Sequence, residues 1–137
     1  MRLWHKDLID VLPRQQLIAQ WRECCAIARN IAENDTPNHI LVNKVMDYPR
    51  QHFIAYTFLV RNEMLKRGYK CDGENFTKWL DEWDSFKINK SDIFDGWHND
   101  RYLKQCYYNL QEKYDCGGVP DDDWIRIHGR YVNHDGV

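Results

Sequence analysis

Apolar side chains recur at helical spacing in three stretches of the chain. In the first, from Pro13 to about Glu33, successive apolar positions are three or four residues apart: Leu17, Trp21, Cys24, Ala28 and Ile31. This spacing places them on one face of a helix. Pro13 suits a first turn, where its missing N–H is not needed, and Pro37 follows the expected end. The stretch predicts an amphipathic helix.

The second and third stretches show the same periodicity. From about Pro49 to Arg67, apolar residues recur at Phe53, Tyr56, Val60 and Met64, with Asp47 near the expected start and Gly68 after a cationic last turn. From about Asn99 to Tyr114 they recur at Tyr102 or Leu103, Cys106, Leu110 and Tyr114, before Cys116-Gly117-Gly118 breaks the pattern. Each stretch predicts a helix.

The rest of the chain carries weaker signals. Residues 71–98 are acidic and rich in Trp, which predicts one short helix around Phe76 to Phe86 and loops. No stretch alternates apolar and polar residues as a strand does, and no internal repeat appears. We therefore expect an all-α fold with three main helices plus short helices and loops.

Length and composition indicate one compact domain over residues 1–137. The chain has 137 residues and 43% hydrophobic content, with six Trp and eight Tyr, which is enough for one packed core. No apolar run is long enough to span a bilayer, and the amino terminus lacks the pattern of a secretory signal. We expect a cytoplasmic monomer that does not bind membranes.

The five cysteines favour reduced thiols over a disulfide framework. They are odd in number, and Cys24 and Cys25 are adjacent. A zinc site that combines Cys71, Cys116 and a histidine is an alternative, but no ligand spacing favours it. We expect no metal and no cofactor.

Charge is unevenly distributed along the chain. The formal net charge is −2, which on its own argues against a protein that coats a polyanion. Residues 44–70, however, carry six Lys or Arg against two acids, whereas residues 71–100 carry eight acids against three Lys. The basic segment is compatible with nucleic-acid binding, and solvated faces without a polyanionic partner are the alternative.

The amino-terminal region could bring an amine close to a carboxylate. On a helical wheel Gln16, Gln20, Glu23 and Ile27 follow one flank of the first apolar stripe, so Glu23 borders the core. The α-amine of Met1 would have a pKa of roughly 7.7 to 8.0, against about 10.4 for lysine, and is partly unprotonated near neutral pH. Such an amine can attack an electrophilic sugar carbon.

Three sequence blocks carry a family resemblance. The first contains Leu12, Gln15, Leu17, Ala19, Trp21 and Arg22-Glu23, the second is Leu65-Lys66-Arg67-Gly68-Tyr69, and the third runs from Trp124 to Arg130. On these residues the chain resembles the pyrimidine-dimer DNA glycosylases of the phage endonuclease V type. Its opening, Met-Arg-Leu-Trp-His, is similar to a bacterial branch of that family. Residues 71–98 match poorly.

The resemblance implies an all-α enzyme that binds damaged double-stranded DNA, flips a nucleotide out, removes the base and cleaves the abasic site. In the family an amino-terminal α-amine forms a Schiff base at C1′ and a glutamate transfers protons. Here the glutamate matches Glu23. Because the bulk of Arg2 should block removal of the initiator, the amine would belong to Met1. Lys6 is an alternative nucleophile, provided that its pKa is lowered.

DNA contacts follow from the same resemblance and from the basic side chains near it. The expected contacts are Arg2, His5, Gln15, Arg22, Lys113, Arg126 and Arg130. Trp124 lies close to Arg126 and Arg130 in the sequence and is expected to pack in the core. Leu3, Gln16, Ala26 and Asn109 stand where the phage enzyme has cationic or titratable side chains, so we expect a weaker grip on DNA.

Two other functions remain open on sequence grounds. The chain could be a non-catalytic nucleic-acid-binding protein that retains the fold, or a protein of this fold with no nucleic-acid role. In either case Glu23 would be an ordinary helical carboxylate paired with a neighbouring cation.

Overall fold

The computed structural model describes residues 2–33, 39–78 and 88–134. In this part of the chain all regular structure is helical, with no strand, which confirms the all-α prediction. The elements are η1 (Lys6–Val11), α1 (Arg14–Glu33), α2 (Ile40–Met46), α3 (Arg50–Lys66), α4 (Glu74–Thr77), η2 (Lys90–Asp92), α5 (Asp100–Asp115) and α6 (Asp121–His134).

The three helices expected from apolar periodicity are present as α1, α3 and α5. Asp47 does not cap the start of α3: it is the C-cap of α2, and Pro49 occupies the N-cap of α3 without a side-chain hydrogen bond. After α5, Gly117 has φ of 84°, the left-handed conformation that glycine adopts most easily. The α5 helix therefore ends where the sequence indicates.

Two helices were not expected. The short α2 begins after His39, whose Nδ1 accepts a hydrogen bond from the N–H of Val42. The longer α6 begins with Asp121, Asp122 and Asp123 in its first turn, where carboxylates interact favourably with the helix dipole. The sequence block from Trp124 to Arg130 is therefore helical.

The acidic segment is only partly described. Its helix α4 covers Glu74–Thr77, and most of the helix expected around Phe76 to Phe86 falls on residues 79–87, outside the described part. Phe76 itself is fully buried and packs its ring 5.7 Å from that of Phe53 on α3. The start of this segment is thus part of the core.

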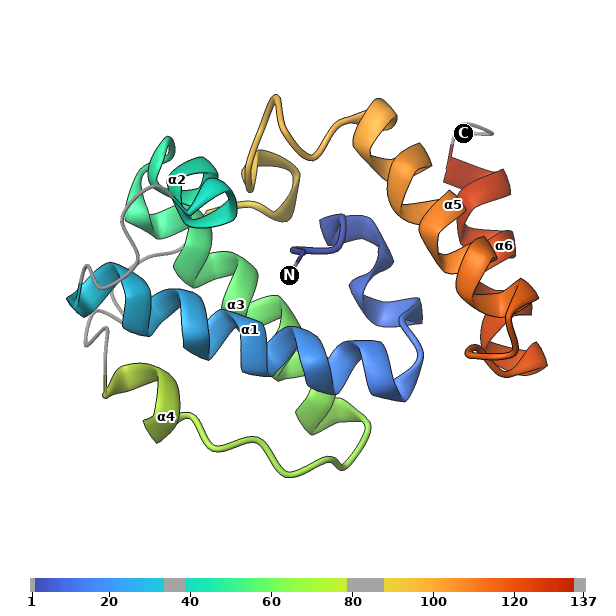
Figure 1. The fold of residues 1–137 in the computed structure, drawn as a ribbon, viewed down its shortest axis with the longest axis horizontal. Helices are drawn as coiled ribbons and strands as arrows, with labels where there is room; N and C mark the ends of the chain where they lie inside the picture. The colour runs from blue at the N-terminus through green and yellow to red at the C-terminus, as the bar shows by residue number, and fades with distance from the viewer. Residues whose placement is uncertain (1, 34–38, 79–87, 135–137) are drawn as a thin grey trace.

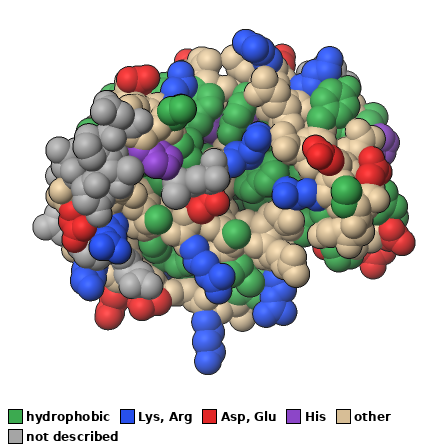
Figure 2. All heavy atoms as spheres, viewed as in Figure 1, with side chains coloured by type: hydrophobic (Ala, Val, Ile, Leu, Met, Phe, Trp, Pro, Cys, Tyr) green, Lys and Arg blue, Asp and Glu red, His purple; other side chains and the backbone are tan. Residues whose placement is uncertain are grey.

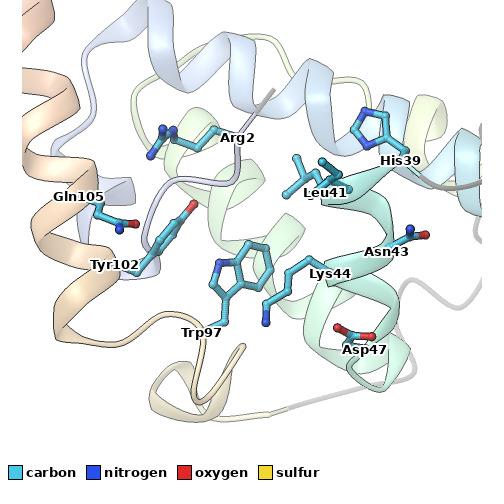
Figure 3. Close-up of a pocket in the computed structure, with 10 residues that line it drawn as sticks. Arg2, His39, Leu41, Asn43, Lys44, Asp47, Trp97, Tyr102 and Gln105 are labelled. Carbon is cyan, nitrogen blue, oxygen red and sulfur yellow. The ribbon is translucent and has the colours of Figure 1, made fainter.

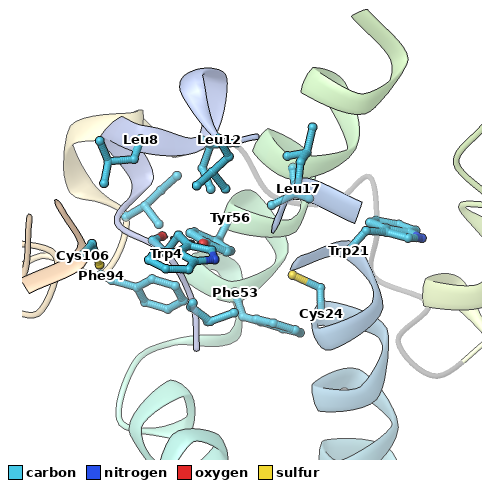
Figure 4. Close-up of a cluster of buried hydrophobic side chains, with 14 of the residues drawn as sticks. Trp4, Leu8, Leu12, Leu17, Trp21, Cys24, Phe53, Tyr56, Phe94 and Cys106 are labelled. Atoms are coloured by element: carbon cyan, nitrogen blue, oxygen red, sulfur yellow. Dashed lines mark hydrogen bonds between the residues drawn. The ribbon is translucent and has the colours of Figure 1, made fainter. Parts of the chain in front are cut away.

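The core is strongly aromatic and lies beneath the amino-terminal segment. Trp4, Leu8 and Leu12 from that segment meet Leu17, Trp21 and Cys24 of α1 and Phe53 and Tyr56 of α3, as Figure 4 shows. Leu3, Leu8, Leu12 and Leu17 are completely buried. The burial of this much apolar surface fixes the first residues of the chain against the domain.

The amino-terminal segment, residues 2–13, lies between two helical layers. Its 3₁₀-helix η1 contacts α3 on one side and α6 on the other, and α5 packs against α6 (Figure 1). The hydroxyl of Tyr102, near the start of α5, donates to the carbonyl oxygen of Leu3 at 2.6 Å. The segment is therefore held by elements that come from both ends of the chain.

The surface carries both signs of charge. Figure 2 shows Lys and Arg side chains dispersed among acidic ones over the face that it presents, with apolar side chains reaching the surface near its centre. All five cysteines are unpaired thiols, and burial raises the pKa of Cys25 to about 11. None of the helices described here has the length and apolar character needed to cross a membrane.

Candidate active site at the amino-terminal segment

A buried glutamine fixes the backbone of the amino-terminal segment. Gln20 of α1 is 1% exposed. Its Oε1 accepts a hydrogen bond from the N–H of Trp4 at 2.7 Å, and its Nε2 donates to the carbonyl oxygen of Arg2 at 2.9 Å. The amide thus satisfies a backbone donor and a backbone acceptor that would otherwise lack partners in the interior.

A tyrosine of α3 contacts both this glutamine and the same backbone. The hydroxyl of Tyr56 donates to the carbonyl oxygen of Trp4 at 2.5 Å and lies 3.1 Å from Oε1 of Gln20. Complete burial raises the pKa of Tyr56 well above its usual value, so the hydroxyl stays neutral and remains a donor. Together Tyr56 and Gln20 position residues 2–4.

Glu23 lies one turn beyond Gln20 and meets the same backbone. Its Oε2 accepts a hydrogen bond from the N–H of Arg2 at 3.1 Å and lies 3.4 Å from Nε2 of Gln20. The side chain is half-buried, at the border of the core as the helical wheel predicts. A carboxylate is therefore fixed beside the second backbone nitrogen of the chain.

Glu23 faces a pocket of about 470 Å³ between α1 and α5. Four of the residues expected to act on DNA line this pocket together: Arg2, Gln15, Glu23 and Lys113. The other residues that line it are Trp4, Gln16, Ala19 and Asn109. Arg2 and Lys113 place two cations near the carboxylate, an arrangement that suits a phosphate-bearing ligand whose reacting atom approaches Glu23.

Met1 lies outside the described residues, so the position of its amine is a prediction.

The analysis of the sequence did not predict a role for Gln20, which contacts both Arg2 and Glu23. The signal was present, since Gln20 follows the polar flank of α1 one turn before Glu23, next to the apolar stripe. A polar residue at such a border needs a partner when it is buried.

His5 and Arg22 lie away from this pocket. His5 is 2% exposed and is the N-cap of η1: its Nδ1 accepts a hydrogen bond from the N–H of Asp7. Arg22 is exposed on α1. The side chain of His5 is thus part of the interior, whereas Arg22 is accessible to a ligand.

The two arginines of α6 are engaged with carboxylates. Arg130 donates to Oδ1 and Oδ2 of Asp10 at 2.5 and 2.7 Å, and to the carbonyl oxygen of Asp7 at 2.7 Å. Burial alone would raise the pKa of Asp10, but the hydrogen bond and charge of Arg130 hold it below its usual value. Arg126 is paired with Asp123 of the same helix. Arg130 therefore joins α6 to η1, whereas Arg126 forms an ion pair within α6.

Lys6, the alternative nucleophile, is also engaged. Its side chain is buried, and Nζ donates to the carbonyl oxygens of Ser91 and Ile93, both at 2.8 Å. Burial lowers the pKa of Lys6, as an amine nucleophile requires. Its two hydrogen bonds, however, hold the side chain in a different pocket from Glu23, one that His98 also lines. Within the described ranges, no three His, Cys, Asp or Glu side chains are grouped so as to hold a metal ion.

Comparison with known families gives one match. Residues 1–76 match the family model described as pyrimidine dimer DNA glycosylase. The matched part includes the amino-terminal segment, α1 with Gln20 and Glu23, and α3 with Tyr56. Searches of curated proteins and of solved structures find no match to the chain.

Proposed function

The chain belongs to the pyrimidine dimer DNA glycosylase family, and from this premise we propose that it acts on pyrimidine-dimer-type lesions in double-stranded DNA through a Schiff base. In this proposal the α-amine of Met1 is the nucleophile and Glu23 the general acid and base. The enzyme removes the damaged base and then cleaves the abasic site, without a cofactor. We further propose that it acts as a monomer in the cytoplasm.

The contact between Arg2 and Glu23 is the observation that supports this mechanism. The Arg2 nitrogen lies 3.1 Å from Oε2 of Glu23. Three covalent bonds join that nitrogen to the Met1 amine, a span of at most about 4.3 Å. On this covalent geometry we propose that the amine of Met1 acts beside Glu23. If Met1 were removed, the Arg2 nitrogen itself would be the terminal amine, already in contact with the carboxylate.

The chemistry follows from this pairing. The lone pair of the neutral amine attacks C1′, the glycosidic C1′–N bond breaks, and the base leaves with the bonding electrons. The nitrogen of the adduct then loses one proton, the C1′–O4′ bond breaks, and O4′ takes up a proton as the sugar ring opens. The product is a protonated imine, whose positive charge the Glu23 carboxylate stabilises. A base then removes a proton from C2′, and the C3′–O bond breaks with the phosphate as leaving group. In this proposal Glu23 shuttles these protons.

The pocket residues supply the proposed DNA contacts. Arg2, Gln15 and Lys113 line the pocket beside Glu23, and Arg22 is exposed on the same helix as Glu23. Cations in this position can bind the phosphates that flank the reacting sugar. Contacts from His5, Arg126 and Arg130 stay predictions, and each requires a side chain to leave its present partner.

Borohydride trapping tests the mechanism. The protein is incubated with a duplex containing one abasic site, or with a UV-irradiated duplex, and borohydride reduces any imine to a stable covalent adduct. We expect an adduct with the wild type and a 100-fold or greater loss of its rate in Glu23→Gln, since general acid–base catalysis contributes roughly 10²–10⁴-fold.

A matched control is available on the same helix. Glu33 is an exposed carboxylate of α1 paired with Arg29, and Glu33→Gln should leave trapping unchanged. The absence of any adduct, together with salt-dependent duplex binding, would indicate instead a non-catalytic DNA-binding protein. An adduct whose rate is the same in Glu23→Gln would refute the role of Glu23.

A further inference from the structure

One side of α5 is exposed along the length of the helix. Helices α5 and α6 form one end of the molecule (Figure 1), and Tyr107 of α5 packs against Trp124 and Tyr131 of α6. On another side, Tyr102 and Gln105 point toward a depression of about 720 Å³ beside α2, as Figure 3 shows. The side between these two faces solvent.

Five exposed residues follow this side of the helix at spacings of three, four, four and three. We call them the α5 stripe: Arg101, Lys104, Tyr108, Glu112 and Asp115. At roughly 100° per residue, all five lie within about 40° of one line along the helix. Tyr108, which is 51% exposed, stands at the centre, with the two cations before it and the two carboxylates after it.

The order of these charges opposes the preferences of an isolated helix. The helix dipole favours carboxylates near the start and cations near the end, whereas the α5 stripe has the reverse order. Arg101 and Lys104 are like charges three residues apart, as are Glu112 and Asp115, and such pairs destabilise a helix. Within the described part of the chain, none of these four side chains forms a hydrogen bond or an ion pair. Their charges are therefore available to a partner outside the chain.

The α5 stripe is complementary to itself when two copies of α5 lie antiparallel. If the two Tyr108 rings meet on a two-fold axis, each residue faces the one at the same distance on the other side of Tyr108. Lys104 and Glu112 both lie four residues from Tyr108, about 6 Å along the helix, and Arg101 and Asp115 both lie seven residues from it, about 10 Å. Every cation then faces a carboxylate.

Only the antiparallel arrangement gives this match. In a parallel pair Lys104 would face Lys104 and Glu112 would face Glu112, which repel each other. In the antiparallel pair the cations of each stripe also lie at the carboxyl-terminal end of the other helix, where the dipole favours positive charge. The charge order that is unfavourable in one helix is therefore favourable in the pair.

From these observations we propose that the α5 stripe binds the α5 stripe of a second copy of this chain as an antiparallel two-fold pair. The Tyr108 rings pack on each other at the centre, and four ion pairs, two of each kind, flank them. One pair of helices buries less surface than a standard protein interface, so the pairing is reversible and depends on concentration.

The Glu23 pocket stays open in this pair. The pocket residues on α5 are Asn109 and Lys113, and none of the residues of the α5 stripe lines the pocket. Asn109 and Lys113 lie roughly 100° and 140° around the helix from Tyr108. Each copy keeps a complete pocket, so the single chain remains the catalytic unit. The pairing goes beyond the proposed function and does not depend on it.

Sedimentation velocity of the protein without DNA tests the pairing. We expect the wild type to form a dimer as its concentration rises, with a dissociation constant that increases with salt. Lys104→Glu changes two symmetry-related contacts from attraction to repulsion and should weaken the dimer roughly 30-fold, and Glu112→Lys should do the same. Glu33→Lys is the matched control: it reverses an exposed charge on α1 and should leave the dimer unchanged.

Mixing the two variants separates this pairing from any other. Lys104→Glu has carboxylates at positions 104 and 112, whereas Glu112→Lys has cations at both, so each variant repels itself and attracts the other. We expect the mixture to form a dimer under conditions in which each variant alone is monomeric. The double variant that carries both substitutions should again pair with itself.

Three results would overturn the proposal: a wild type that stays monomeric at high concentration and low salt, a dimer that persists in both single variants, or a mixture that forms no dimer. Recovery of the dimer in the mixture also shows that both variants are folded. Because no measurement involves DNA, failure of the pairing would leave the proposed chemistry intact. Failure of borohydride trapping would likewise leave the pairing intact.

Discussion

The amino-terminal site and the α5–α6 pair both contain many polar and aromatic side chains, but these side chains have different partners. At the site, Gln20 and Tyr56 are buried and bind backbone atoms of residues 2–4, which leaves Glu23 at the edge of a pocket. On α6, Arg130 binds Asp10 and Arg126 binds Asp123. Charged groups that satisfy each other stabilise the fold, whereas a charged group positioned by neutral buried donors remains able to meet a ligand.

The largest effect that would sharpen this comparison is expected at Gln20. Gln20→Met removes the partners of the Trp4 N–H and the Arg2 carbonyl oxygen, so we expect a loss of about 2 kcal/mol in the free energy of unfolding. Because the Arg2 backbone then shifts relative to Glu23, the rate of borohydride trapping should fall roughly 10- to 100-fold. Chemical denaturation and trapping at saturating DNA measure the two effects.

Tyr56→Phe is the matched control for Gln20. It removes the hydroxyl that donates to the Trp4 carbonyl oxygen but keeps Gln20 and its bonds to the Trp4 N–H and the Arg2 carbonyl oxygen, so it should cost about 1 kcal/mol of stability. Trapping should then decline by less than about fivefold. Equal losses of trapping in both variants would contradict a larger part for Gln20 than for Tyr56 in placing the Arg2 backbone beside Glu23.

The next effect is a loss of stability at low pH, which arises from a buried histidine, His98, outside the Glu23 pocket. His98 is buried, its Nδ1 accepts from the N–H of Lys6 at 3.0 Å, and burial, then the nearby His5 and Lys6, lower its pKa to about 2. The unfolded chain binds a proton near pH 6.5 that the folded chain does not. Stability is therefore complete above about pH 6.5 and decreases as the pH falls, by up to about 1.4 kcal/mol per unit.

Denaturation midpoints between pH 7.5 and 5 measure this slope. His98→Gln keeps an acceptor in the side chain but cannot be protonated, so the variant should lose part of the slope even if it is less stable at neutral pH. An unchanged slope in a folded variant would assign the acid sensitivity to other groups.

A smaller effect is expected on α6. Arg130→Met breaks the two-pronged pair with Asp10, both partners of which are partly exposed, so screening limits the cost to about 1 kcal/mol. Because the pKa of Asp10 is held low in the fold, this contribution is present at neutral pH and is lost as the pH falls through that lowered value. Duplex affinity tests the predicted DNA contact of the same residue: a loss of several-fold in a stable variant would support it, and a change of less than about twofold would remove Arg130 from the interface.

The smallest effect is expected at Arg22, where the substitution should change DNA binding and not stability. The side chain is exposed on α1, so Arg22→Ala should leave the denaturation midpoint unchanged. One lost phosphate contact should weaken duplex binding several-fold and reduce the slope of log affinity against log salt by about 1. A titration series at increasing salt measures this slope, and an unchanged slope would remove Arg22 from the interface.

Much of the fold could be predicted from the sequence because helical periodicity is a local property. The helices α1, α3 and α5 each carry a continuous apolar stripe. The helix α6 also carries one, at Trp124, Ile127 and Tyr131, but the acidic run before it was interpreted only as charge rather than as a favourable first turn. The helix α2 buries only Val42 and Val45, which is too short a pattern to recognise.

The site was predictable to the extent that it depends on residues close in sequence or on family resemblance. Glu23, Arg2, Gln15 and Lys113 were predicted from the sequence, and in the structure they line one pocket; their roles stay predictions. The depression lined by Lys44, Trp97 and Tyr102 was not predicted, because these residues come together only through tertiary packing. Periodicity indicates which face of a helix is buried, but not which other element covers it.

The most direct test of the account is to locate the adduct on the chain. After borohydride reduction with an abasic duplex, nuclease and protease digestion followed by mass spectrometry identifies the modified nitrogen, and the intact mass shows whether Met1 is present. We predict that the DNA remnant is attached to the α-amine of Met1. Attachment to the ε-amine of Lys6 or of another lysine would contradict the assignment of the nucleophile, and the absence of an adduct would contradict the Schiff-base mechanism.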